Sequence, residues 1–217
     1  MTGLRERKKR RTRSTLIDVA VDLCQRQGYD RTTVEQIAAA AEVSTRTFSR
    51  YFPTKESVIA AAADEIDEII AAALATQPTD ISAYEALLRA HLGAFTPDET
   101  GPSPAFTRTA VMIQIVNASP TLNESAFAIK QDLAENASLR EIGARLGLPP
   151  TDVSVRLIAD TWTVLFATSF RGMGTPGNDP IEAEVLCTRL AATFETFARL
   201  TAPPHADGQP PAGASQR

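Results

Sequence analysis

The chain has 217 residues, of which 43% are hydrophobic and 22% charged, as in ordinary soluble globular proteins. Its net charge of -4 combines unlike parts, because residues 1–55 hold 12 Lys and Arg against 6 Asp and Glu, whereas the rest holds 10 against 20. No segment has the roughly 18 apolar residues of a membrane helix, and no hydrophobic signal segment follows the basic start. We therefore expect a soluble, cytoplasmic protein with no membrane partner.

Helical periodicity dominates the chain, which predicts an all-α fold of about nine helices. The first expected helix covers residues 13–27 and stops at Gly28. A second follows the capping-box pattern of Thr33 and Gln36, and a third runs from Ser44 or Thr45 to about Tyr51, before Pro53. The later helices are expected at 55–77, 81–95, 104–117, 122–147, 151–171 and 180–200, the last capped by Asp179 and Pro180.

The second and third helices form a helix-turn-helix pattern within residues 33–52. Ala38 supplies a small residue where the helices cross, and Val43 and Phe48 are expected in the core. Thr45, Arg46, Thr47 and Arg50 are then left on the exposed face, although an ordinary helical hairpin has the same pattern. Seven basic residues and one acid within residues 5–13 precede the first helix. They predict an arm that binds phosphates or enters the minor groove, the alternative being a solvated charge run.

Several short motifs resemble the DNA-binding domain of TetR-family transcriptional regulators. They are Gly28-Tyr29, Thr32-Thr33-Val34, Ile37-Ala38, Val43-Ser44, Thr47-Phe48 and Arg50-Tyr51-Phe52-Pro53-Thr54-Lys55-Glu56. The resemblance covers about residues 10–60. It implies a homodimeric, ligand-responsive repressor that binds a palindromic operator in double-stranded DNA, with the third helix in the major groove and the last two long helices pairing between subunits. In the family, a ligand in the body moves the fourth helix and so changes the separation of the two DNA-reading heads.

We accordingly divide the chain into a basic N-terminal arm (1–12), a helix-turn-helix DNA-binding domain (13–55), a ligand-binding and dimerisation domain (56–201) and a disordered tail (202–217). Arg46 is expected to read a guanine and Thr45 and Thr47 to meet base edges. The remaining candidates for DNA contact are Arg10, Arg11, Arg13, Thr33, Ser44, Arg50, Tyr51 and Lys55.

Two positions depart from the family pattern. Glu42 stands in the turn where the family commonly has glycine, and a left-handed backbone there would cost a non-glycine residue about 1–2 kcal/mol. We therefore expect a turn of different shape. Ser49 stands where the family often has tyrosine, which removes one candidate phosphate contact.

Aromatic and aliphatic residues in the second half predict an apolar effector cavity with few charges. Each of these residues has the alternative of being ordinary core. The effector is expected to be a hydrophobic small molecule, and a fatty acyl thioester is a candidate because the middle of the chain faintly resembles family members that respond to such compounds. The expected lining comprises Phe95, Phe106, Met112, Ile113, Val116, Phe127, Trp162, Phe166 and Phe170.

The last two long helices carry more apolar surface than one subunit's core is expected to absorb, which predicts a dimer interface. The candidates are Val153, Leu157, Leu165, Val185, Leu186, Leu190, Phe194 and Phe197.

An enzyme is the main alternative class, but the chain has only two histidines, His91 and His205, and no metal spacing, nucleophile elbow or phosphate-binding glycine loop. Cys24 and Cys187 are far apart and are expected to pack as small apolar residues. We expect no metal and no cofactor. A second alternative is that residues 5–27 bind an anionic membrane or an acidic protein, against which Asp18 and Asp22 on the same helix argue.

Overall fold

The structure is a computed structural model that describes residues 3–99, 101–125, 136–174 and 180–202. Its secondary structure in these ranges is ten helices and one isolated bridge, between Asp98 and Gly101. None of these helices is long and apolar enough to cross a membrane. The helices are α1 (Leu4–Gln27), α2 (Val34–Ala40), α3 (Thr45–Tyr51), α4 (Lys55–Ala75), α5 (Ala83–Phe95), α6 (Pro104–Ala118), α7 (Pro120–Ser125), α8 (Ala137–Leu146), α9 (Val153–Phe170) and α10 (Ala183–Thr201).

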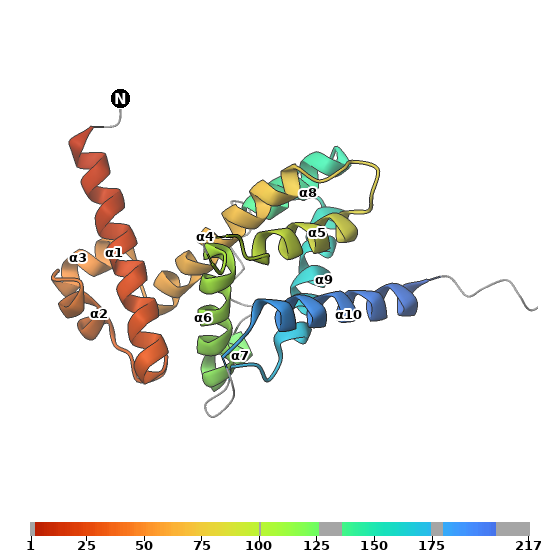
Figure 1. Cartoon of the computed structure of the whole chain (residues 1–217). Coiled ribbons are helices and arrows are strands. Elements are labelled where there is room, and N and C mark those ends of the chain that lie inside the picture. The colour runs from red at the N-terminus through yellow and green to blue at the C-terminus, as the bar shows by residue number, and fades with distance from the viewer. Residues whose placement is uncertain (1–2, 100, 126–135, 175–179, 203–217) are drawn as a thin grey trace, which may run out of the picture.

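The helices form two units with separate cores (Figure 1). We call α1–α3 with the first half of α4 the head, and α5–α10 with the second half of α4 the body. Leu16, Ile37 and Phe48 are fully buried in the head core, where Phe48 packs near Phe52 with ring centroids 6.0 Å apart. The long helix α4 contributes to both cores and joins the units.

Three expected helix boundaries are wrong. The first helix begins at Leu4 instead of residue 13, since the Arg and Lys residues before it are good helix formers even without an apolar stripe. The expected helix 122–147 is replaced by α7 and α8, which begins at an Asn136 cap, and residues 126–135 lie outside the described residues. The last helix begins at Ala183 behind Glu182, because the preceding chain is extended where Ile181 is buried.

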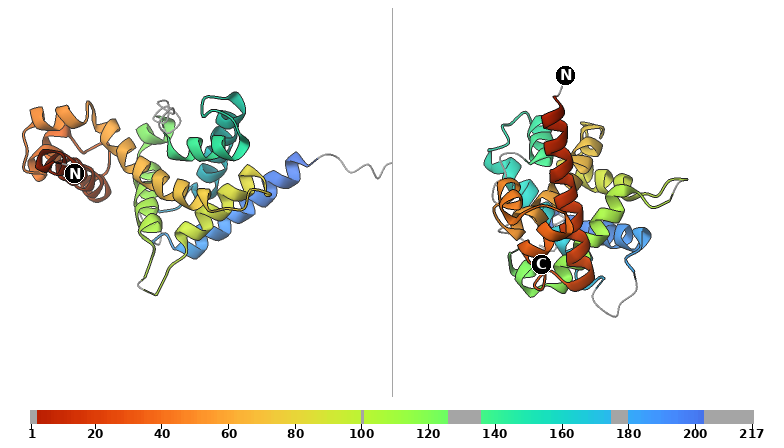
Figure 2. Two further views of the ribbon diagram at one scale, coloured as in Figure 1. Left: turned by 90° about the horizontal axis from the view of Figure 1, so that it is seen from above. Right: turned by 90° about the vertical axis from the view of Figure 1, so that its left-hand side faces the viewer.

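The body also reaches the head through α6 and α7. Ile115 and Leu122 are buried among head residues rather than in the body core. Seen from above, α6 stands beside both α1 and α4 (Figure 2), in agreement with its packing against both helices. The head is therefore attached to the body at two places. Of the predicted tail 202–217, only residue 202 is among the described residues.

Candidate nucleic-acid interface and body core

Side-chain caps fix both helices of the helix-turn-helix. Thr33 and Gln36 form the predicted capping box at the start of α2, and the Ser44 hydroxyl accepts a hydrogen bond from the Thr47 amide at the start of α3. Ala38 is buried at the crossing, and Val43 packs against the head core. These interactions hold α3 in place on the head, with one face open.

The turn between these helices keeps a left-handed residue although it has no glycine. Glu42 has φ +54°, and the amides of Glu42 and Val43 donate to the carbonyls of Ala39 and Ala38 at 3.1 and 2.9 Å. This is a Schellman motif, in which the left-handed position is usually glycine. The expectation of a differently shaped turn is therefore wrong, because the backbone bonds outweigh the steric cost.

The open face of α3 carries Thr45, Arg46, Ser49 and Arg50, all exposed. Thr47 is less accessible than Thr45. It is half-buried, and its hydroxyl lies 3.0 Å from that of Ser44. The Arg50 guanidinium lies 5.4 Å from the centroid of the Tyr51 ring. Arg46 is thus the exposed cation of the first turn of α3.

Lys55 lies where α4 meets the loop between α1 and α2. Its ammonium donates to the carbonyls of Tyr29 and Thr32 at 2.8 and 2.9 Å and lies 3.9 Å from the centroid of the Tyr29 ring. The Tyr29 hydroxyl donates to Glu56 Oε1 at 2.5 Å. The geometry opposes the expected phosphate contact of Lys55, since two donors of its ammonium already satisfy backbone carbonyls.

The same network shifts two pKa values. Burial, assisted by the hydrogen bond to Glu56, raises the pKa of Tyr29. Donation by the Tyr29 hydroxyl lowers the pKa of Glu56. Both pKa shifts favour a protonated Tyr29 phenol that donates to an ionised Glu56 carboxylate. The contact therefore holds the start of α4 against the loop after α1 at neutral pH.

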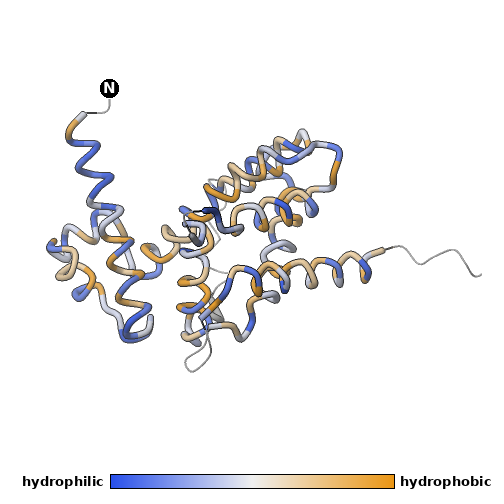
Figure 3. Tube along the Cα trace, in the orientation of Figure 1, coloured by the Kyte–Doolittle hydropathy of each residue, from blue (hydrophilic) through white to orange (hydrophobic). Residues whose placement is uncertain are grey.

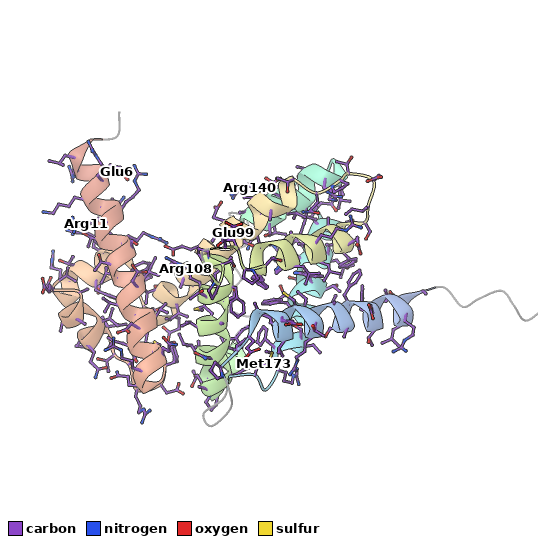
Figure 4. All side chains as sticks on the ribbon, viewed as in Figure 1. Glu6, Arg11, Glu99, Arg108, Arg140 and Met173 are labelled. Carbon is purple, nitrogen blue, oxygen red and sulfur yellow. The ribbon has the colours of Figure 1, made fainter. Side chains whose placement is uncertain are left out.

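The basic residues of α1 lie on a helix rather than in a flexible arm. Arg10 and Arg11 are exposed, and Arg13 is half-buried with its guanidinium 5.3 Å from the Phe52 ring centroid. Figure 4 shows the Arg11 side chain projecting from the upper half of α1. Arg13 therefore stabilises the join between α1 and the end of α3, whereas the residues before it extend past the head core.

The expected effector-site residues do not form one cluster. Those in the body core or packed against it are Phe95, Phe106, Ile113, Trp162, Phe166 and Phe170. Met112 instead packs against the head core, because its neighbour Ile113 takes the body-facing side of α6. Val116 belongs to neither core, and Phe127 lies outside the described residues.

The sequence did not single out His91 for this cluster, yet it lies at its centre. Its ring centroid is 5.1 Å from that of Trp162, 5.3 Å from that of Phe166 and 5.9 Å from that of Phe95. The Trp162 indole N–H points at His91 Nε2 at 3.4 Å, and His91 Nδ1 is 2.8 Å from the Leu87 carbonyl. This pattern suits a neutral ring that carries its proton on Nδ1. On α6, the Thr109 hydroxyl is buried and has no hydrogen-bond partner among the described residues.

The predicted dimer residues divide by exposure. Val153 and Leu157 are 77% and 63% exposed on α9, and Val185 is 46% exposed on α10. Leu186 and Leu190 are fully buried in the body core, so their assignment to an interface is wrong. Leu165 is buried in the body core and, with Phe197, lines an open groove of about 540 Å³ between α9 and α10. Phe194 packs half-buried on the body core.

Polar contacts bind the head to α6. Arg108 pairs with Glu65 of α4 and lies 3.8 Å from Asp18 of α1, and Figure 4 shows it between head and body. Gln25 of α1 donates to Gln114 of α6 at 3.1 Å. The Ser119 hydroxyl, just after α6, donates to the Asp30 carboxylate at 3.1–3.2 Å. The sequence predicts a head–body connection through α4, whereas this second connection has no local sequence signal.

A capped, rigid helix-turn-helix whose second helix presents a polar, basic face, joined to a helical body, defines a DNA-binding protein of the helix-turn-helix class. Residues 16–62 match the family model described as bacterial regulatory proteins, tetR family. The chain is 39% identical to the HTH-type transcriptional regulator TcmR of Streptomyces glaucescens over 153 residues, 69% of this chain and 67% of TcmR. The chain belongs to the TetR family of transcriptional regulators, and is thus a regulator rather than an enzyme.

Other relatives agree. An uncharacterized HTH-type transcriptional regulator of Mycobacterium tuberculosis is 36% identical over 110 residues, half of each chain. Two solved structures share the fold: a TetR-family regulator from Syntrophomonas wolfei (TM-score 0.58, 19% identity, 88% of this chain and 96% of that one) and Thermus thermophilus FadR in complex with lauroyl-CoA (TM-score 0.50, 20% identity, 93% and 100%).

Proposed function

We propose that this regulator is a cytoplasmic, ligand-responsive repressor that binds a palindromic operator as a homodimer and is released by a hydrophobic small molecule. The observation that carries the proposal is the pairing of an exposed polar and basic face on α3 with an aromatic body core to which the head is fastened twice. A change in the body can reach the head through either attachment.

In the operator complex, Arg46 reads a guanine and Thr45 contacts a neighbouring base edge. Both are exposed in the first turn of α3, the part of a recognition helix that meets base edges. Thr33, Ser44, Arg50 and Tyr51 lie at helix caps or at the end of α3, where they hold phosphates. Lys55 is left out of this set because its ammonium binds two carbonyls of the head.

Substitution of Arg46 by alanine tests the reading role. Each lost bidentate contact to guanine costs about 1–3 kcal/mol and the homodimer loses two, so operator affinity falls roughly 30-fold or more and base preference relaxes at one position of each half-site. Arg26→Ala is the matched control, because Arg26 is also exposed but lies in the last turn of α1, where it pairs with Asp22. Anisotropy titration on operators varied one base at a time measures both effects, and unchanged affinity rejects the role.

The proposed dimer uses the outward faces of α9 and α10. Val153, Leu157 and Val185 are apolar and exposed there, and exposure of large apolar side chains to solvent is unfavourable. Leu157→Glu places a charge in that face without touching the body core. We expect a monomer in sedimentation velocity and weak operator binding, and a variant that still sediments as a dimer with full affinity contradicts this interface.

The proposed effector site is the aromatic core around His91. It offers apolar rings together with few polar groups, the His91–Trp162 pair and the unpartnered Thr109 hydroxyl, which is the usual composition of small-molecule sites. Thermus thermophilus FadR shares this fold and holds lauroyl-CoA, which makes acyl thioesters the first compounds to test. An effector must raise the thermal midpoint of the protein and release the operator. Failure of every hydrophobic compound to do both removes this part of the proposal.

A further inference from the structure

The first nine residues of α1, Leu4 to Thr12, extend beyond the head core; we call them the basic extension. Every side chain from Leu4 to Arg11 is exposed, and the first buried residue of the helix is Leu16. At about 1.5 Å per residue the basic extension is about 13 Å long. In Figure 1 it projects upward past α2 and α3, at the end of α1 opposite the loop that leads to α2.

The basic extension holds six cations and one acid, Glu6. Because an α-helix turns every 3.6 residues or so, six cations between positions 5 and 11 point in all directions around the axis. None of the ion pairs found among the described residues involves them. The protein therefore maintains a concentrated positive charge that its own described residues do not neutralise.

The shape of the basic extension decides how it can meet DNA. An α-helix with side chains is about 10–12 Å wide, whereas the minor groove of B-DNA is about 6 Å wide. A helical segment therefore does not fit the minor groove, which favours the phosphate-binding alternative of the predicted arm. Duplex DNA carries a negative charge about every 1.7 Å of its axis, so ~13 Å of duplex presents about eight phosphates to the six cations.

Composition favours DNA over a membrane as the partner. Membrane-surface helices need an apolar face, and Leu4 is the only large apolar residue of the basic extension. Figure 3 shows this end of α1 as hydrophilic throughout, apart from its tip.

From these observations we infer that the basic extension is a rigid helical DNA clamp that binds backbone phosphates of duplex flanking the half-site, without reading sequence. The inference rests on the proposed operator binding by α3 and adds a contact outside the half-site. If three cations of the dimer's two basic extensions contact phosphates, log K against log salt is steeper by about 2.7, so raising salt from 50 to 200 mM costs roughly 40-fold more affinity than without the extensions.

The test uses the full chain with Arg5, Arg7, Lys8 and Lys9 changed to Gln, which preserves helix propensity. A control variant changes Arg89, Arg140, Arg171 and Arg199 to Gln, an equal change of net charge placed on the body. Salt titrations by anisotropy use a selected operator with and without 10 flanking base pairs at each end, and an arbitrary duplex of the longer length. We expect the plot of log K against log salt to be shallower than for wild type only in the variant of the basic extension, and only on the two longer duplexes.

Two further results decide the inference. Thr12→Pro keeps every cation but interrupts the helix, so it must lose most of the advantage of flanking DNA, whereas Thr12→Ala must retain it. Equal salt slopes for wild type and the four-Gln variant, full flank dependence in Thr12→Pro, or tighter binding to anionic lipid vesicles than to duplex overturns the clamp. Absence of any preference for the operator over the arbitrary duplex defeats the proposed function instead, and leaves the slopes on the arbitrary duplex to judge the clamp separately.

Discussion

Replacement of Glu42 by glycine is expected to stabilise the head, because this residue occupies the left-handed position of the Schellman motif that ends α2. The side chain is exposed, so its removal leaves no cavity. A non-glycine residue pays about 1–2 kcal/mol for a left-handed backbone. Glycine also destabilises the folded state by about 0.5–1 kcal/mol, because its unfolded chain has the larger conformational entropy. The expected net stabilisation is about 0.5–1 kcal/mol, or roughly 1–4 °C in Tm for a chain of this size.

Thermal and urea unfolding followed by far-UV circular dichroism measure this change, while Trp162 fluorescence reports on the body core. Glu42→Ala is the matched control, since it removes the same carboxylate but keeps a Cβ and its steric cost. The stability of Glu42→Asn is expected to lie between those of Glu42→Gly and Glu42→Ala, because Asn tolerates a left-handed backbone better than most residues. An equal gain in Glu42→Ala would assign the effect to charge, and a loss of stability in Glu42→Gly would refute the backbone argument.

Three further changes probe the fastenings of the head. Tyr29→Phe is expected to lower stability by about 1 kcal/mol at pH 7. Since the folded pKa of Glu56 lies below its ordinary value of 4.5, that stabilisation is present above 4.5 and is lost as pH falls through the lowered value, so urea curves of the two proteins converge in acid. Lys55→Met leaves the buried Thr32 carbonyl without its donor, while the Tyr29 carbonyl keeps the Thr32 amide, and is expected to cost about 1–3 kcal/mol with the salt slope of DNA binding unchanged; a slope shallower by about 1 per subunit would make Lys55 a phosphate contact after all. Arg108→Gln breaks exposed ion pairs and is expected to cost under about 1 kcal/mol, yet to speed hydrogen exchange in α1 where it faces α6.

The features that sequence could predict are those fixed by local chemistry. The Thr33–Gln36 capping box and the burial of Ala38 and Phe48 all follow from spacing and residue type. Glu42 shows the limit of such reasoning, because residue type argued against a conformation that the two backbone hydrogen bonds of the motif impose.

The features that it could not predict depend on which neighbour a face meets. Leu186 and Leu190 lie on the apolar face of α10, but periodicity alone does not say whether that face packs on its own body or on a partner, and both are buried in the body. Ile113 and Met112 are adjacent and similar, yet they face different cores because α6 runs between head and body. The helical start at Leu4 had no apolar period to signal it.

The double attachment of the head limits how it can move. A head held by α4 alone could swivel about the axis of that helix, with only side-chain contacts to resist it. The contacts of Asp30, Gln25 and Asp18 with α6 and its C-terminal end add a second attachment, and two attachments oppose the swivel. What remains is displacement of the head together with α6, so in the proposed homodimer the spacing of the two heads on DNA is tied to the position of a helix that also lines the aromatic core.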